Sequence, residues 1–204
     1  MGQIIRLYEE HTNEKQLREV VKALEAGAVI IYPTDTLYAL GCSLNSIKAI
    51  NRIKEIKRKD TDDLSLVCPD LSKVSDYARI DNRIFKILKR NTPGAFTFIL
   101  PASNNIPNKF LERKRTVGIR IPRNRIPVAI TEMLGAPLVS TSLTFSSLDE
   151  EDTINPELIW EEYKNTVDIL VDGGYASLHP STVVDLSEGT VEIIRQGEAV
   201  LEEA

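Results

Sequence analysis

The stretch that decides the fold is AVIIYPTDTLYALGC, which covers residues 28–42. Its first five residues form an unbroken apolar and aromatic run, which is typical of a strand covered on both faces. Pro33 ends the strand because it has no N–H group to donate. Thr34, Asp35 and Thr36 follow directly. Hydroxyls and a carboxylate at the carboxyl end of a buried strand are typical of the ligand site of an open α/β sheet. A strand followed by a plain polar turn fits these residues equally well.

Outward from this strand, short apolar runs alternate with helical apolar spacings, which favours an α/β fold. Strands are predicted at residues 4–7, 28–32, 64–68, 96–100, 117–121, 138–141, 168–171, 182–185 and 192–195, with a turn at Gly41 and loops at 101–108 and 149–152. Helices are predicted after caps at Asn13, at Asn45 or Ser46 and at Asp81, with Ile84, Phe85, Ile87 and Leu88 inward in the third, and at residues 127–134 and 156–163. We expect residues 1–204 to form a single domain, α/β with α+β character, around a twisted mixed sheet flanked by helices.

Composition narrows the class of protein. The chain has 204 residues, of which 42% are hydrophobic and 27% charged, as is ordinary for a soluble globular protein. Cys42 and Cys68 lie in apolar surroundings and form no Cys-x-x-Cys pair, which predicts buried free thiols rather than a disulfide or a zinc site. The two histidines, His11 and His179, are far apart in the sequence, which argues against a histidine-based metal site or catalytic triad. No signal peptide or membrane-length apolar run is present, so we expect a cytoplasmic protein with no membrane partner.

Charge is unevenly distributed along the chain. The formal net charge is -5, yet residues 48–125 carry 19 lysines and arginines against 8 acidic residues. We expect these cations to converge on one concave face and to serve an anionic partner, a nucleotide or RNA. The alternative is that they are solvated helix faces that keep the protein soluble.

Several side chains are candidates for phosphate chemistry. Walker sequences and the Gly-x-Gly-x-x-Gly fingerprint are absent, which excludes those phosphate-binding loops. The candidates are cations and hydroxyls near the ends of predicted elements: Lys57, Arg58, Lys59, Thr116, Arg120, Ser140, Ser142, Ser181, Thr182 and Arg195. Such groups hold phosphates and stabilise the charge that develops in phosphoryl or adenylyl transfer. Cations at helix C-termini also complement the helix dipole, and Ser-Thr-Ser after a strand is commonly a turn.

Seven short motifs occur in one order along the chain. They are Pro33-Thr34-Asp35-Thr36-x-Tyr38-Ala39-Leu40-Gly41, residues 53–59, Thr92-Pro93-Gly94-x-x-Thr97, Thr116-Val117-Gly118-Ile119-Arg120-x-Pro122, Ser140-Thr141-Ser142, Ser181-Thr182-Val183-Val184-Asp185 and Arg195-x-Gly197. Together they resemble the YrdC-like superfamily, the threonylcarbamoyladenylate synthases, over residues 23–197. The details look closest to the YciO branch, for example Asp35 where the synthases usually have glutamate. That branch is described as a translation factor with a double-stranded RNA-binding type of fold.

The resemblance implies a YrdC/RibB-type fold and a specific reaction. The synthases join L-threonine, bicarbonate and ATP into threonylcarbamoyl-AMP and pyrophosphate, for modification of tRNA, and they use Mg²⁺ with the ATP. By resemblance, threonine would be bound by Thr34, Arg120, Ser140 and Ser181. The nucleotide would be bound by Lys57, Arg58, Lys59, Thr116, Ser142, Thr144 and Arg195. The resemblance assigns no covalent nucleophile and no protein metal ligand.

This sequence departs from the synthase pattern at four places. Where the synthases have Lys-x-Arg, this chain has Lys57-Arg58-Lys59, and where they have Lys-Pro-Leu, it has Asp62-Asp63-Leu64. The Ser-x-Asn of the synthases is replaced by Ser142-Leu143-Thr144, and a histidine is replaced by Val67 or Cys68. A lysine replaces a planar bidentate donor by a point charge, and threonine lacks the amide of asparagine. We therefore expect the fold and an anion-binding cavity to be retained and the synthase activity to be weakened.

Two other functions fit parts of the sequence. One is a double-stranded RNA-binding, translation-associated protein without synthase activity, for which tRNA or duplex RNA is the partner. The other is the sugar-phosphate chemistry of dihydroxybutanone phosphate synthase on a related scaffold. That chemistry needs an acidic, metal-holding cluster, and Asp35 with residues 60–63 does not assemble one from sequence.

Overall fold

The computed structural model describes residues 2–10, 12–57, 64–111 and 114–202, and within them ten strands form a single sheet. The strands are β1 (Gln3–Arg6), β2 (Ile30–Tyr32), β3 (Ala39–Ser43), β4 (Ser65–Val67), β5 (Phe96–Pro101), β6 (Thr116–Arg120), β7 (Leu138–Ser142), β8 (Ile169–Asp172), β9 (Thr182–Asp185) and β10 (Glu192–Arg195). The α-helices are α1 (Glu14–Glu25), α2 (Ile47–Lys57), α3 (Asn82–Asn91), α4 (Asn108–Leu111), α5 (Arg125–Leu134) and α6 (Pro156–Tyr163). The described residues also contain the 3₁₀-helices η2 (Leu71–Asp76) and η3 (Glu150–Ile154).

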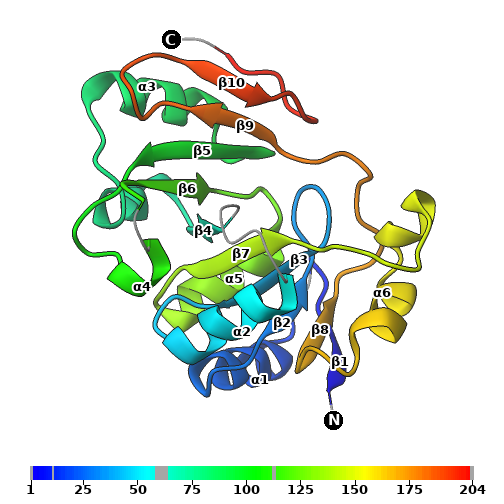
Figure 1. Cartoon of the computed structure of the whole chain (residues 1–204). Helices are drawn as coiled ribbons and strands as arrows, with labels where there is room; N and C mark the ends of the chain where they lie inside the picture. The colour runs from blue at the N-terminus through cyan, green and yellow to red at the C-terminus, as the bar shows by residue number, and fades with distance from the viewer. Residues whose placement is uncertain (1, 11, 58–63, 112–113, 203–204) are drawn as a thin grey trace.

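The sheet is mixed, as expected. Its order is β1-β8-β2-β3-β7-β4-β6-β5-β9-β10 (Figure 1). The pairs β1·β8, β8·β2, β4·β6 and β5·β9 are parallel, and the other neighbours run antiparallel. Short connections join the antiparallel pairs β2·β3 and β9·β10, whereas β3·β7 and β4·β7 pair strands that lie far apart in the chain. The predicted α/β fold with a twisted mixed sheet and flanking helices is therefore confirmed.

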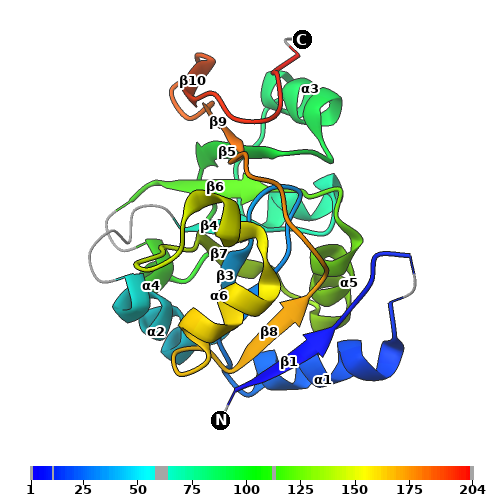
Figure 2. The ribbon, with the colours of Figure 1, turned by 90° about the vertical axis from the view of Figure 1, so that its right-hand side faces the viewer.

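Two apolar clusters lie on the two faces of the sheet. Alternation along each strand sends one set of side chains to α2, α3 and α6, and the other set to α1 and α5. Figure 2 shows α2 and α5 on opposite sides of β3 and β7. On the α1/α5 face, Ser65 of β4 and alternate side chains of β5, β6 and β9 line a cleft. The site described below lies there.

The predicted turn at Gly41 is wrong, because Gly41 lies in the middle of β3. Its Cα is opposite Ile30 of β2 and Ser140 of β7. A glycine is needed there for space, since a Cβ at this position would lie 2.6 Å from Cε1 of the buried Tyr32 ring. The apolar run therefore continues past the Thr34–Thr36 turn as a second buried strand.

Gly41→Ala is expected to destabilise the fold without changing its topology. Overpacking against a fixed ring and backbone costs about 1–3 kcal/mol, because Val139 O is also within 3.3 Å of the new Cβ. Urea denaturation of the wild type and the variant measures the change. An unchanged midpoint would mean that the Tyr32 ring moves freely, contrary to its complete burial.

Other local predictions are confirmed or corrected. Asn13 and Asp81 cap α1 and α3, and the Ser46 hydroxyl accepts a hydrogen bond from the Ala49 N–H in the first turn of α2. Phe85 was predicted to face inward, but it is 45% exposed because it falls outside the Ile84–Ile87–Leu88 stripe. The predicted loop at 101–108 leads into the short helix α4, and the predicted loop at 149–152 enters η3.

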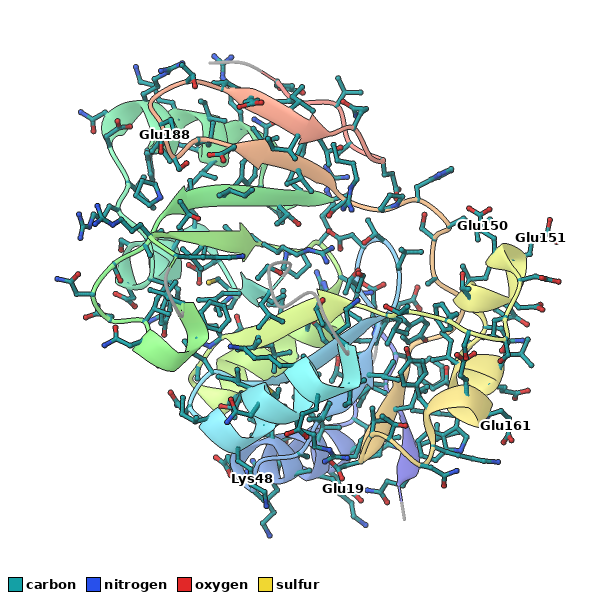
Figure 3. The ribbon with its side chains drawn as sticks, in the orientation of Figure 1. Glu19, Lys48, Glu150, Glu151, Glu161 and Glu188 are labelled. Carbon is teal, nitrogen blue, oxygen red and sulfur yellow. The ribbon has the colours of Figure 1, made fainter. Side chains whose placement is uncertain are left out.

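An acidic surface segment is formed by η3 and the neighbouring helix α6. Glu150, Glu151 and Glu161, on η3 and α6, point outward into solvent (Figure 3). The predicted acidic surface at 149–152 is therefore confirmed, although its backbone is a 3₁₀-helix. Across the described ranges, no helix is both long and apolar enough to span a membrane.

Candidate functional site

A notch in the sheet defines the candidate site. Strand β4 begins at Ser65, whose Cα lies opposite Gly118 of β6 and Ser140 of β7. The flanking strands extend further, β6 from Thr116 and β7 as far as Ser142. The strand that separates β6 from β7 is thus short, as Figure 1 shows. A cleft of about 550 Å³ opens at this place, a volume typical of a small-molecule site.

One wall of the cleft carries a hydrogen-bonded cation. Arg195, at the end of β10, donates to Ser181 O from Nε at 3.2 Å and from one terminal nitrogen at 2.9 Å. The Ser181 hydroxyl lies 3.0 Å from the Thr97 hydroxyl of β5. All three residues line the cleft, so the structure brings together Ser181, which was assigned to threonine, and Arg195, which was assigned to the nucleotide, with Thr97 beside them.

Arg120 supplies a second cation to the same cleft. Its guanidinium donates to Thr36 Oγ1 at 3.1 Å and to Thr34 Oγ1 at 3.4 Å. Burial lowers the pKa of Arg120 below its usual value, the Arg195 charge adds to that effect, and Tyr32 and Asp35 oppose it. An arginine remains charged under such shifts. Two guanidinium groups held near each other in a partly desolvated cleft attract an anion.

The Thr34–Thr36 turn is fixed from behind. The Thr34 hydroxyl accepts the Thr36 N–H at 3.1 Å and donates to Leu37 O at 2.8 Å. The Asp35 carboxylate accepts the backbone N–H groups of Arg123 and Asn124, at 2.8 and 2.6 Å, where α5 begins. Consequently Thr36 lines the main cleft, whereas Thr34 lines a smaller adjoining pocket.

Ser140, like Thr34, Lys57 and Thr144, is not among the residues that line the main cleft. It is 1% exposed and shares a hydrogen bond of 2.6 Å with the Tyr32 hydroxyl. Burial raises the pKa of Tyr32 to about 12, outweighing the opposing effects of Ser140 and Arg120. The geometry therefore gives Ser140 the task of holding a neutral tyrosine beneath the cleft.

Lys57 joins helix α2 to the end of β7. Its ammonium donates to Ser142 O at 3.0 Å and to Thr144 Oγ1 at 2.9 Å. Tyr163 of α6 holds the same segment, since its hydroxyl donates to Thr144 O and accepts the Thr144 N–H. The predicted nucleotide residues Arg58 and Lys59, and the acidic Asp62 and Asp63, lie outside the described residues.

Hydroxyls that the sequence reading did not select also line the cleft. Thr36, Thr97 and Thr141 join the predicted Thr116 and Ser142. For Thr97, the alternation of polar and apolar residues along β5 could have indicated this position. Phe96 and Phe98 pack in the core, and Thr97 between them faces the cleft. The described lining includes no aspartate or glutamate.

The expected convergence of all cations of residues 48–125 on one face is wrong for the described residues. Arg120 and Lys114 line the main cleft. Arg79 and Arg83 instead line a groove beside the β9–β10 connection, and Arg52 pairs with Asp168 at 2.5 Å near the end of α1. Arg83 lies on α3, Arg79 donates to Asn104 Oδ1, and Arg52 forms a local ion pair, so the alternative of separate surface cations fits these three residues.

Metal and thiol chemistry find little support in the described residues. They contain no group of three or more histidine, cysteine or acidic side chains arranged to hold a metal ion. Cys42 and Cys68 are buried free thiols, as predicted, and burial raises the pKa of each to about 12. Neither thiol is a thiolate at neutral pH, so neither is a nucleophile there.

Comparison with known proteins identifies the family. The family model for Sua5, YciO and YrdC proteins, described as "Telomere recombination", matches residues 22–197. The chain belongs to this family. Among its relatives, Escherichia coli YciO is 38% identical over 201 residues, covering 97% of this chain and 96% of YciO. The threonylcarbamoyl-AMP synthase of Vibrio vulnificus is 29% identical over 186 residues, covering 89% of this chain and 98% of the synthase.

Solved structures of Sua5/YciO/YrdC proteins share the fold. The crystal structure of E. coli YciO superimposes with a TM-score of 0.90 and 37% identity, covering 97% of this chain and 96% of that one. The structure of P. abyssi Sua5 complexed with L-threonine gives a TM-score of 0.85 and 26% identity, covering 95% of this chain and 57% of that one. The predicted YrdC-type fold and the likeness to YciO are confirmed.

Proposed function

We propose that the cleft binds ATP and L-threonine, and that the protein is a nucleotide-binding protein of the threonylcarbamoyl-AMP synthase type with a low synthase turnover. The observation that carries this proposal is the convergence of the Arg120 and Arg195 guanidinium groups on a hydroxyl-lined cleft whose described lining contains no carboxylate. The name of the V. vulnificus relative and the L-threonine complex of P. abyssi Sua5 add support.

In this proposal Arg120 binds the threonine carboxylate. Its guanidinium is anchored by Thr36 and Thr34 through one terminal nitrogen, which leaves other N–H groups for a ligand. An arginine held in this way presents a planar pair of donors to a carboxylate. The Ser181 hydroxyl, close to Thr97 and Arg195, is the nearby partner for the polar side chain of threonine.

The nucleotide phosphates occupy the remaining polar part of the cleft. Thr116 and Ser142 flank the notch, Arg195 lies across from them, and Lys57 lies at its edge. In the reaction, a carbamate oxygen of N-carboxythreonine forms a bond to the α-phosphorus, and the bond from that phosphorus to the pyrophosphate oxygen breaks. The cations offset the negative charge that accumulates during this step.

Magnesium would enter with ATP, held by the phosphate oxygens, because the described lining offers no carboxylate to hold it. Bound there, it would supply positive charge to the phosphates. The protein's own part is to bind and orient the two substrates.

The low turnover follows from the departures in sequence. Thr144, where the synthases usually have asparagine, accepts from Lys57 and is held by Tyr163 at the end of β7. The threonine hydroxyl at this position offers one hydrogen-bond donor and lacks the amide group of asparagine. Lys59 lies outside the described residues and stays a sequence-based part of the proposal.

Calorimetric titration with ATP, with threonine and with duplex RNA tests the proposed function. We expect ATP to bind, threonine to bind in the presence of ATP, and ATP affinity to fall as ionic strength rises, because phosphate contacts are screened. Saturable binding of duplex RNA without any ATP or threonine heat would favour the RNA-binding alternative. ATP affinity that is flat with salt would contradict the cationic site.

Lys57→Ala is expected to weaken ATP binding more than it weakens folding. Loss of one charged hydrogen bond to phosphate costs about 1.5 kcal/mol, roughly tenfold in Kd. Lys48→Ala is the matched control, since Lys48 lies on the same helix and points into solvent (Figure 3). Calorimetry and thermal melting separate the two effects. Equal ATP affinity in the Lys57 and Lys48 variants would remove Lys57 from the site.

A further inference from the structure

The turn that joins β2 to β3 contacts a strand that is not its neighbour. In the sheet, β7 and β4 lie between β3 and β6. The hydroxyls of Thr34 and Thr36 nevertheless accept hydrogen bonds from Arg120, the last residue of β6, at 3.4 and 3.1 Å. The turn therefore reaches across two intervening strands to hold the guanidinium of Arg120.

Asp35, between the two threonines, makes a second contact with the same part of the chain. Its carboxylate accepts the N–H groups of Arg123 at 2.8 Å and of Asn124 at 2.6 Å. These residues follow Arg120 closely in the sequence. The contacts thus form a closed ring, in which the hydroxyls of the turn hold the Arg120 guanidinium and Asp35 holds the backbone that follows Arg120.

Capping of α5 does not account for the bonds of Asp35. The first N–H groups of this helix belong to Arg125 and Ile126, and they are already accepted by Glu9 Oε2 at 3.0 Å and Asn124 Oδ1 at 2.9 Å. Asp35 binds the two N–H groups that precede the helix. The residues that carry these two groups are at least partly exposed, so water can satisfy the groups as well. The ring with Arg120 is what Asp35 adds.

We propose that Asp35 is a positioning residue for Arg120, and that it fixes the plane of the guanidinium for the carboxylate of an amino-acid ligand. This inference rests on the proposed binding of threonine by Arg120. An arginine side chain has several rotatable bonds, and ordering it during binding costs free energy. The ring orders the side chain before the ligand arrives, with one terminal nitrogen on the turn and the other N–H groups held in a constant direction.

Positioning and simple electrostatics predict opposite effects of removing Asp35. The charge of Asp35 is negative, so by itself it opposes the binding of a carboxylate nearby, and its removal would strengthen the contact between Arg120 and that carboxylate. If Asp35 positions Arg120, its removal releases the turn and weakens the same contact. The direction of the change in threonine affinity therefore separates the two explanations.

Asp35→Ala tests the proposal by calorimetry with threonine in the presence of ATP, and with inorganic tripolyphosphate alone. We expect threonine affinity to fall about tenfold, comparable with the loss of one charged hydrogen bond. Tripolyphosphate affinity is expected to stay unchanged, because the proposed phosphate contacts lie elsewhere in the cleft. Glu9→Ala is the matched control, since it also removes a carboxylate that accepts a backbone N–H group where α5 begins, and it should leave threonine affinity unchanged.

A double-mutant cycle shows whether Asp35 acts through Arg120. In the Arg120→Lys protein, Asp35→Ala should weaken threonine less than twofold further, because residues that act as one unit are not additive. Asp35→Asn loses the charge but keeps one acceptor oxygen, so its threonine affinity should lie between those of the wild type and Asp35→Ala. Thermal melting shows whether each variant is folded, and Asp35→Asn replaces Asp35→Ala in the cycle if the latter does not fold.

Each contrary outcome has a distinct meaning. Unchanged or tighter threonine binding by Asp35→Ala would overturn the positioning role while the proposed function stands. Equal losses in Glu9→Ala, a parallel loss of tripolyphosphate, or losses that multiply in the cycle would mean a general loosening of the fold and would overturn it as well. If the wild type binds no threonine, the proposed function fails and this inference fails with it.

Discussion

Replacing Arg120 by lysine is expected to reduce threonine affinity by roughly ten- to hundredfold, equivalent to about 1.5–3 kcal/mol for lost charged hydrogen bonds. Because lysine keeps the positive charge, the loss of threonine affinity would come from the changed hydrogen-bond geometry. Arg120 uses one terminal nitrogen for Thr36 and Thr34 and has further N–H groups for the ligand carboxylate. A lysine ammonium is a point charge and cannot serve both sides in one plane. Calorimetric titration of threonine in the presence of ATP measures the change.

Arg83→Lys is the matched control for this prediction. Arg83 lies in the groove beside the β9–β10 connection, away from the main cleft, so the same substitution there should leave threonine affinity unchanged. Thermal melting of both variants shows whether burial of Arg120 makes its replacement destabilising. Wild-type threonine affinity in Arg120→Lys would contradict the role given to this guanidinium.

The double substitution Lys59→Arg with Thr144→Asn is expected to raise threonine-dependent pyrophosphate release. Each change restores a residue type of the synthase motifs. Restoring one positioned donor at a developing charge is worth about 2.7–4 kcal/mol, roughly a hundred- to a thousandfold in rate, although two changes at one site need not add. The structure bears on the second change, because Thr144 Oγ1 receives the Lys57 ammonium and an asparagine oxygen can receive it as well.

Pyrophosphate release with ATP, threonine, bicarbonate and magnesium measures that gain, and the omission of threonine gives the background. Thr153→Asn is a control, since Thr153 lies in η3, outside the cleft lining, and its hydroxyl bonds Glu150 O. Robust turnover by the wild type would contradict the prediction. It would mean that residues already present perform the work of the missing arginine and asparagine.

Most of the fold could be predicted because apolar periodicity and caps act locally. The stripe of α1 and the caps Asn13 and Asp81 follow directly from sequence. Strand β3 could not be found in this way, since Gly41 and Ser43 are weak strand formers and its stability comes from pairing with β2 and β7. Gly41 is required by a contact with Tyr32 across the sheet. Such a contact exists only after folding.

The site could be predicted in part, for the same reason. Arg120, Ser181 and Arg195 belong to motifs and are found together in the cleft. Ser140 and Thr34 belong to the same motifs, yet the first holds Tyr32 and the second stabilises a turn. Which of two neighbouring hydroxyls reaches a cleft depends on strand register and on side-chain partners. A sequence motif determines neither the strand register nor the side-chain partners.

The shortness of β4 affects how the sheet can open. Its three residues join β1, β8, β2, β3 and β7 on one side to β6, β5, β9 and β10 on the other. Short ladders open more readily than long ones, so the two groups of strands are natural units of local unfolding. The cleft spans this seam, with Ser142 on one side and Arg120 and Arg195 on the other. A ligand bound there would link the two units, so we expect amide hydrogens of the two groups of strands to exchange more nearly together in a complex than in the empty protein.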